Sequence, residues 1–145
     1  MIIRNASPAD RPVIVSLAGR LTAFDLPRWR QPDEISNADA RAMMEAVLEG
    51  SDQNEVLVAE QDGEVVGCLH MLTMTDFFGR KHAHISVIAT TESAEGRGVG
   101  KAMLQHAEEW SRARGMTLLT LNVFDANARA KRFYERAGFA PETLK

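Results

Sequence analysis

The chain has 145 residues, of which 45% are hydrophobic and 26% charged, as in an ordinary globular domain. A formal net charge of −3 gives no general attraction to nucleic acid or to anionic membranes. A single cysteine, Cys68, excludes an intramolecular disulfide, and neither a secretory signal nor an apolar run of about 20 residues is visible. We therefore expect one domain over residues 1–145, located in the cytoplasm, with no nucleic-acid or membrane partner.

The N-terminal third predicts an edge strand and two helices. Residues 2–4 are short and apolar, and Ser7 and Pro8 have the residue types of a helix start. Apolar residues then recur at helical spacing in residues 14–21 and again in residues 40–48. Each run predicts an amphipathic helix.

Residues 22–37 break this pattern and predict a long loop. They include the aromatic residues Phe24 and Trp29. These fit a pocket wall, and they fit equally well as residues that anchor the loop on the core. The acidic residues Asp25, Asp33 and Glu34 would favour a cationic substrate, or they form a solvated charged loop.

The middle of the chain predicts three strands. Residues 55–60 and 64–73 flank Asp62 and Gly63, a pair typical of a tight hairpin turn. Residues 82–89 follow as a strand. Strict alternation would give this strand two faces: His84, Ser86 and Ile88 on one, and Ala83, Ile85, Val87 and Ala89 on the other.

The last third predicts helix, strand, helix and the start of a final strand. A helix runs to about Arg114, and the apolar residues 116–123 predict a buried strand. Asn127 is expected to cap the next helix, and Phe139 to begin the last strand. The fold class is therefore α/β, with a mixed sheet whose hairpins form an antiparallel half and whose crossover forms a parallel pair.

Residues 91–104 are the segment around which the rest is organised. Three glycines at alternate positions, Gly96, Gly98 and Gly100, separate a strand from a helix. A strand, a glycine-rich turn and a helix N-terminus together form an anion site, most often for phosphate. The spacing differs from a dinucleotide-binding fingerprint, and Ala102 after Lys101 excludes a nucleotide-triphosphate loop.

Two segments resemble the GNAT family of N-acetyltransferases. Residues 95–100, Glu-Gly-Arg-Gly-Val-Gly, are similar to its Arg/Gln-x-x-Gly-x-Gly/Ala acetyl-CoA loop. Residues 127–139 resemble its Asn-x-x-Ala and Phe-Tyr-x-x-x-Gly-Phe pattern, and the order of elements matches over almost the whole chain. The resemblance implies a central, mostly antiparallel sheet with a splayed parallel strand pair and about four helices.

The resemblance also implies an enzyme that transfers an acetyl group from acetyl-CoA, its co-substrate, to a primary amine of a small molecule or protein. The amine attacks directly in a ternary complex, without a metal. Tyr134 would be the general acid near the sulfur, although a core aromatic is the alternative. The implied coenzyme-binding residues are the strand residues Ile88, Ala89 and Thr90, the turn residues Glu95, Gly96, Arg97, Gly98, Val99, Gly100 and Lys101, and Asn127 on the pantetheine side.

Three features depart from the family pattern. Glu95 replaces an Arg or Gln, and a carboxylate beside a pyrophosphate costs affinity, which Arg97 and Lys101 would offset. Ser86 stands where many members have a Glu that acts as the general base. His84 therefore becomes the candidate base, and Glu92 is another candidate. The alternative for His84 is a purely structural role. The family's seventh strand is missing because the chain stops at Lys145, either cut short or completed by a partner chain, which favours a homodimer.

Two rival hypotheses remain open at this point. Glu95 and Ser86 would suit an acetyl-CoA-binding regulatory module with weakened catalysis. A Rossmann-type nucleotide-binding protein is the third possibility, and it would bind NADH.

Overall fold

The computed structural model describes residues 1–20, 32–49, 53–123 and 126–141, with side chains in these ranges except those of 32–36. Its centre is a five-stranded sheet with the order β1-β2-β3-β4-β5. The strands are β1 (Ile2–Asn5), β2 (Asn54–Gln61), β3 (Glu64–Thr75), β4 (Lys81–Thr90) and β5 (Leu119–Leu121). Strands β1 to β4 pair antiparallel and β4 pairs with β5 in parallel, so the predicted mixed sheet is confirmed.

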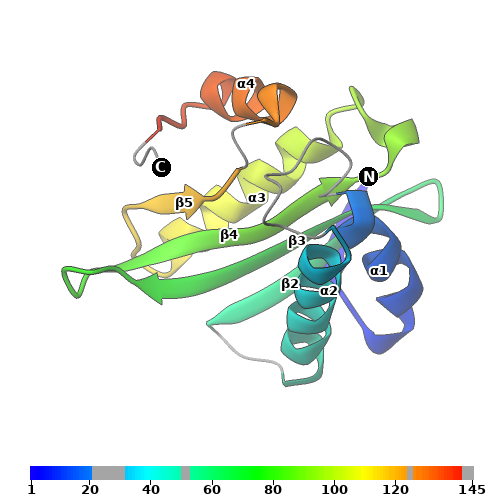
Figure 1. Cartoon of the computed structure of the whole chain (residues 1–145), viewed down its shortest axis with the longest axis horizontal. Coiled ribbons are helices and arrows are strands. Elements are labelled where there is room, and N and C mark those ends of the chain that lie inside the picture. The colour runs from blue at the N-terminus through cyan, green and yellow to red at the C-terminus, as the bar shows by residue number, and fades with distance from the viewer. Residues whose placement is uncertain (21–31, 50–52, 124–125, 142–145) are drawn as a thin grey trace.

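Helices cover both faces of the sheet (Figure 1). A 3₁₀ turn (Pro8–Asp10) leads into α1 (Arg11–Arg20), and α1 and α2 (Pro32–Glu49) pack on one face. The other face carries α3 (Val99–Ala113), with α4 (Ala128–Arg136) beside it. None of the helices in the described part of the chain is long and apolar enough to cross a membrane.

Each face has its own core. The core under α1 and α2 is built on fully buried side chains, among them Ile14, Leu17, Met43, Val58 and Cys68. The core under α3 includes Leu69, Met71, Met103, Leu104 and Trp110. The centre of the sheet is therefore covered on both sides, and most of its strand residues are apolar whichever way they point.

The β2–β3 hairpin turns as predicted at Asp62 and Gly63. Both residues have positive φ, 53° and 81°. This is the backbone twist that a two-residue hairpin turn requires, and Asp and Gly adopt it at low cost.

Ser86 is an extra residue in β4. Val87 pairs with His70, and Ile85 pairs with Met71, the next residue of β3, so Ser86 has no partner of its own in that strand. Such a bulge reverses the face to which the following side chains point. Ile85 accordingly packs in the α3 core and Val87 in the α1/α2 core. The predicted faces of this strand are therefore wrong. The prediction placed one set of residues on one face and the rest on the other: Ala83, Ile85, Val87 and Ala89, against His84, Ser86 and Ile88.

Helix α2 begins earlier than predicted, at Pro32, so the helix includes the last part of the expected loop over residues 22–37. The physical reason lies in the sequence, because Pro at the first helical position and acids in the first turn favour a helix start. Phe24, Asp25 and Trp29 lie outside the described residues, as do the side chains of Asp33 and Glu34.

The C-terminal strands are shorter than predicted. β5 covers only Leu119–Leu121 rather than residues 116–123, and its residues are half-buried. It is half-buried because it lies at the edge of the sheet order and has β4 as its neighbour on one side. Phe139 does not begin a strand in the residues described up to Pro141.

Arg4 ties the edge strand to the start of α1. Its guanidinium donates to both carboxylate oxygens of Asp10, at 2.9 and 3.0 Å, and to Glu60 Oε1 at 2.7 Å. Asp10 is 8% exposed and also accepts a hydrogen bond of 2.8 Å from the backbone N–H of Ser7. The hydrogen bonds from Arg4 hold the pKa of Asp10 below its ordinary value of 3.8.

Arg4→Met is expected to lower the free energy of unfolding by about 2 kcal/mol at pH 7, because it leaves the Asp10 carboxylate buried without its cation. Since the folded pKa of Asp10 is depressed, the stability it contributes is present above pH 3.8 and is lost as the pH falls through the lower, folded value. Urea denaturation from pH 7 to pH 3 measures both effects. Arg11→Met, at an exposed position, is the control, and equal stabilities of the two variants at pH 7 would contradict this assignment.

Candidate active site

The glycine turn has the geometry of an anion site. After a 3₁₀ turn (Glu92–Ala94), Gly96 and Gly98 have φ of 78° and 81°, and Gly98 caps α3. The first helical hydrogen bond, 3.0 Å, runs from Ala102 N–H to the Gly98 carbonyl, so the N–H groups of residues 99–101 precede the helical ladder. These donors lie at the positive end of the helix dipole, where phosphate binds well.

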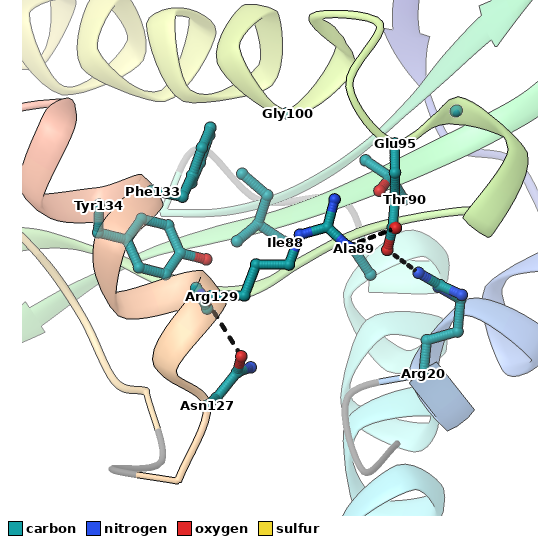
Figure 2. A pocket seen from close by; sticks show the side chains of 12 residues that line it. Arg20, Ile88, Ala89, Thr90, Glu95, Gly100, Asn127, Arg129, Phe133 and Tyr134 are labelled. Carbon is teal, nitrogen blue, oxygen red and sulfur yellow. Dashed lines mark hydrogen bonds and ion pairs between the residues drawn. The ribbon is translucent and has the colours of Figure 1, made fainter. Parts of the chain in front are cut away.

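A pocket of about 260 Å³ opens beside this turn (Figure 2). It brings together seven of the residues predicted for the site, from β4, the glycine turn and α4. These are Ile88, Ala89, Thr90, Glu95, Gly100, Asn127 and Tyr134. Five further residues line it that were not predicted as site residues: Arg20, Ala94, Arg129, Ala130 and Phe133.

The pocket lies where two parallel strands separate. The last residue pair between β4 and β5 is Ile85 with Leu121. From Ser86 to Thr90, therefore, the edge of β4 that faces β5 has no strand partner in the described residues. Backbone N–H and C=O groups at such an edge bind an extended chain as an added strand.

Tyr134 places a hydroxyl at the pocket beside two aromatic rings. Its ring makes edge-to-face contacts with Phe133 and Phe139, with centroids 5.3 and 5.9 Å apart. Figure 2 shows its hydroxyl pointing toward Ile88. Burial raises the pKa of Tyr134 to about 12, so the hydroxyl is protonated at neutral pH and can donate a hydrogen bond.

Asn127 has two functions available at once. Its Oδ1 accepts a hydrogen bond of 3.2 Å from the backbone N–H of Ala130, so it caps α4 as predicted. Because the cap uses the oxygen, the Nδ2 group is the one that can donate to a molecule in the pocket.

Glu95 forms ion pairs with two arginines at the pocket. Its carboxylate accepts hydrogen bonds from Arg20, the last residue of α1, and from Arg129 on α4, the latter at 2.7 Å. The contacts with these arginines, that with Arg129 first, hold the pKa of Glu95 below its ordinary value. Arg129 lies inside the segment that resembles the GNAT pattern, whereas nothing in the sequence pointed to Arg20.

The other predicted site residues do not line this pocket. Val99 is buried in the α3 core, while Gly96, Arg97, Gly98 and Lys101 are exposed around the turn. Among the described residues no cluster of three His, Cys, Asp or Glu side chains could hold a metal ion.

His84 lies on the α1/α2 face and outside the pocket. It is half-buried, and its Nδ1 is 2.7 Å from Thr120 Oγ1 on β5. Burial, with a smaller contribution from His82, lowers its pKa below the ordinary 6.5, so the imidazole is neutral at pH 7. His84 pairs with Thr120 one row before the strands separate.

This arrangement of separated parallel strands and a glycine-rich helix start is the fold of N-acetyltransferases. The chain belongs to the GNAT family, since the profile "Acetyltransferase (GNAT) family" matches residues 21–139. It is 26% identical to the uncharacterized N-acetyltransferase YhfO of Bacillus subtilis over 99% of this chain and 92% of that protein.

Two further relatives agree with this assignment. A putative acetyl transferase from Pyrococcus furiosus superposes with a TM-score of 0.76 at 25% identity, covering 99% of this chain and 95% of that one. Mycothiol acetyltransferase of Propionibacterium freudenreichii is 33% identical over 59% of this chain, and the match spans only 27% of that longer protein.

Gly98→Val is expected to abolish acetyl-CoA binding while the domain stays folded. An ideal Cβ on Gly98 meets nothing within 4 Å, but a β-branched residue is strained at φ 81° and would move the N–H groups of the turn. Isothermal titration with acetyl-CoA measures the loss.

Gly115→Val is the matched control for this prediction. Gly115 also has positive φ, 71°, with open space around it, but it follows α3 at the end away from the pocket. Equal losses of affinity in both variants, or retained binding in Gly98→Val, would contradict the prediction that this turn binds the phosphates of acetyl-CoA.

Proposed function

We propose that this protein transfers an acetyl group from acetyl-CoA to a primary amine. The observation that carries the proposal is the edge of β4 at Ile88, Ala89 and Thr90, which has no strand partner among the described residues. It lines one pocket together with Glu95 of the glycine turn and with Tyr134. The turn would hold the diphosphate, and the strand edge would pair with the pantetheine arm. These interactions would bring the thioester between β4 and Tyr134.

Tyr134 would act on the leaving sulfur. A phenol with a pKa of about 12 stays protonated at pH 7, so it can donate a hydrogen bond to the sulfur as negative charge develops there. Since a thiol has a pKa of about 8.5, proton transfer from this phenol to a free thiolate is uphill. The hydroxyl therefore contributes most in the transition state, and complete protonation of the thiolate draws on solvent.

His84 would accept the proton of the attacking amine, directly or through water. Its lowered pKa keeps it neutral, as a base must be, and it lies beside the point where β4 and β5 separate. Ser86, the bulged residue, is exposed and has no carboxylate to offer. The acceptor would be a small molecule in view of the relatives named mycothiol acetyltransferase and streptothricin acetyltransferase.

Isothermal titration with acetyl-CoA, and with NADH as the control, tests the coenzyme. Release of free thiol in the presence of a panel of amines then tests the transfer. Micromolar binding of acetyl-CoA without turnover of any amine would favour the second candidate, an acetyl-CoA-binding regulatory module, which the absence of a carboxylate at Ser86 supports.

Tyr134→Phe is expected to lower kcat by about a hundredfold, the loss typical of removing a hydrogen-bond donor to charge that develops in the transition state. Because Phe keeps the ring contacts with Phe133 and Phe139, affinity for coenzyme A should be unchanged. Phe133→Leu on the same helix is the control for altered packing. An unchanged kcat in Tyr134→Phe would make Tyr134 a structural aromatic.

His84→Ala is expected to lower kcat/KM by about a hundredfold at pH 7.5. The ratio of wild-type to variant kcat/KM, in which ionisation of the amine cancels, should fall as the pH drops through the lowered pKa of His84. Protonation removes the base in the wild type, whereas the variant has none to lose. A ratio that is independent of pH would show that His84 is structural.

A further inference from the structure

The carboxylate of Glu95 occupies a position between two cations at the pocket. Arg20 comes from α1 and Arg129 from α4, and each contacts a different oxygen of Glu95 (Figure 2). Three separate elements are thereby joined across the pocket wall. All three residues line the same pocket as Ile88 and Tyr134.

The pair of guanidinium groups is suited to a phosphate as well as to a carboxylate. Arginine donates several N–H groups in a fixed plane and binds either anion with charge-assisted hydrogen bonds. Glu95 also directly precedes the turn at Gly96 and Gly98, which leads to the N–H donors of residues 99–101 at the start of α3. The internal carboxylate and a bound diphosphate would therefore draw on the same cations.

The exposure of these side chains permits such an exchange. Side-chain exposure is 29% for Glu95, 32% for Arg20 and 70% for Arg129, so none of the three is locked inside the core. Ion pairs that water reaches are individually weak and re-form readily. Arg129 is the more exposed of the two arginines and is the easier one to redirect.

We propose that Glu95 is an internal competitor of the coenzyme: in the free protein it holds Arg20 and Arg129, and the diphosphate of coenzyme A displaces it from Arg129. This inference rests on the proposed function. The charge of the three side chains together is +1. Repulsion between an ionised Glu95 and a bound diphosphate would therefore offset part of the attraction between the diphosphate and the two arginines. When the product leaves, the Arg129–Glu95 pair re-forms and favours release of coenzyme A.

Glu95→Gln tests the competition directly. It raises the charge of the group to +2 and removes the anion that holds the arginines, so affinity for coenzyme A is expected to increase about fivefold. Glu109→Gln, an exposed residue of α3 away from the pocket, makes the same change in net charge and should leave affinity unchanged. Isothermal titration gives both values, and pantetheine, which lacks phosphate, should bind the two variants equally.

A double-mutant cycle with Arg129→Gln separates competition from a structural effect. Arg129→Gln should weaken coenzyme A binding more in the Glu95→Gln background than in the wild type, because only there is Arg129 fully available to the ligand. Arg112→Gln, on α3 with 72% of its side chain exposed, is the control for the lost positive charge. Circular dichroism verifies that each variant is folded.

The outcomes distinguish this inference from the proposed function. Wild-type protein that does not bind coenzyme A overturns the function itself. If the wild type binds and Glu95→Gln binds equally or more weakly, Glu95 orders the site rather than competing, and the inference is wrong. If Glu95→Gln is unstable, the double variant Arg20→Gln/Arg129→Gln provides the test. It should weaken coenzyme A binding, and unchanged binding would overturn the inference.

Discussion

The end of the pairing between β4 and β5 is the constraint on which the rest of the site depends. Parallel strands cannot be joined by a tight turn, so α3 must cross over between them, and the glycine turn at its start lies at the end of β4. β5 pairs with β4 only as far as Ile85, so in the part of the chain that the structure describes the backbone from Ser86 to Thr90 has no strand neighbour on that side. Backbone groups of this kind need a partner, and a ligand can supply one.

The bulge at Ser86 gives this strand a second property. Because it reverses the faces, Ile88 packs against the α3 core on the pocket side, while Val87 and Ala89 fill the α1/α2 core. A regular strand would place His84 on the face of Ile88. With the bulge, His84 is on the opposite face, so the proposed base and Ile88 lie on different sides of β4.

Local patterns in the sequence predicted the parts of the site that local rules determine. The glycine turn, the cap at Asn127 and the Asp62–Gly63 hairpin each follow from a few adjacent residues. The bulge at Ser86 could not be predicted from the sequence. Both cores require apolar residues, and the alternation from Ala83 to Ala89 looks regular in either register. The short β5 was missed for a related reason: apolar residues around it pack on α3 without belonging to a strand, as Met116 does.

Arg20 could not have been found from the sequence, since its partner Glu95 is 75 residues away along the chain. This contact also changes the meaning of the unusual carboxylate. Considered alone, Glu95 is a negative charge placed where a phosphate should bind, and it argues against the coenzyme. With Arg20 and Arg129 beside it the local charge is positive. Under our proposal the carboxylate would modulate an anion site rather than argue against one. A substitution in a motif therefore has to be judged together with the residues that the fold brings to it.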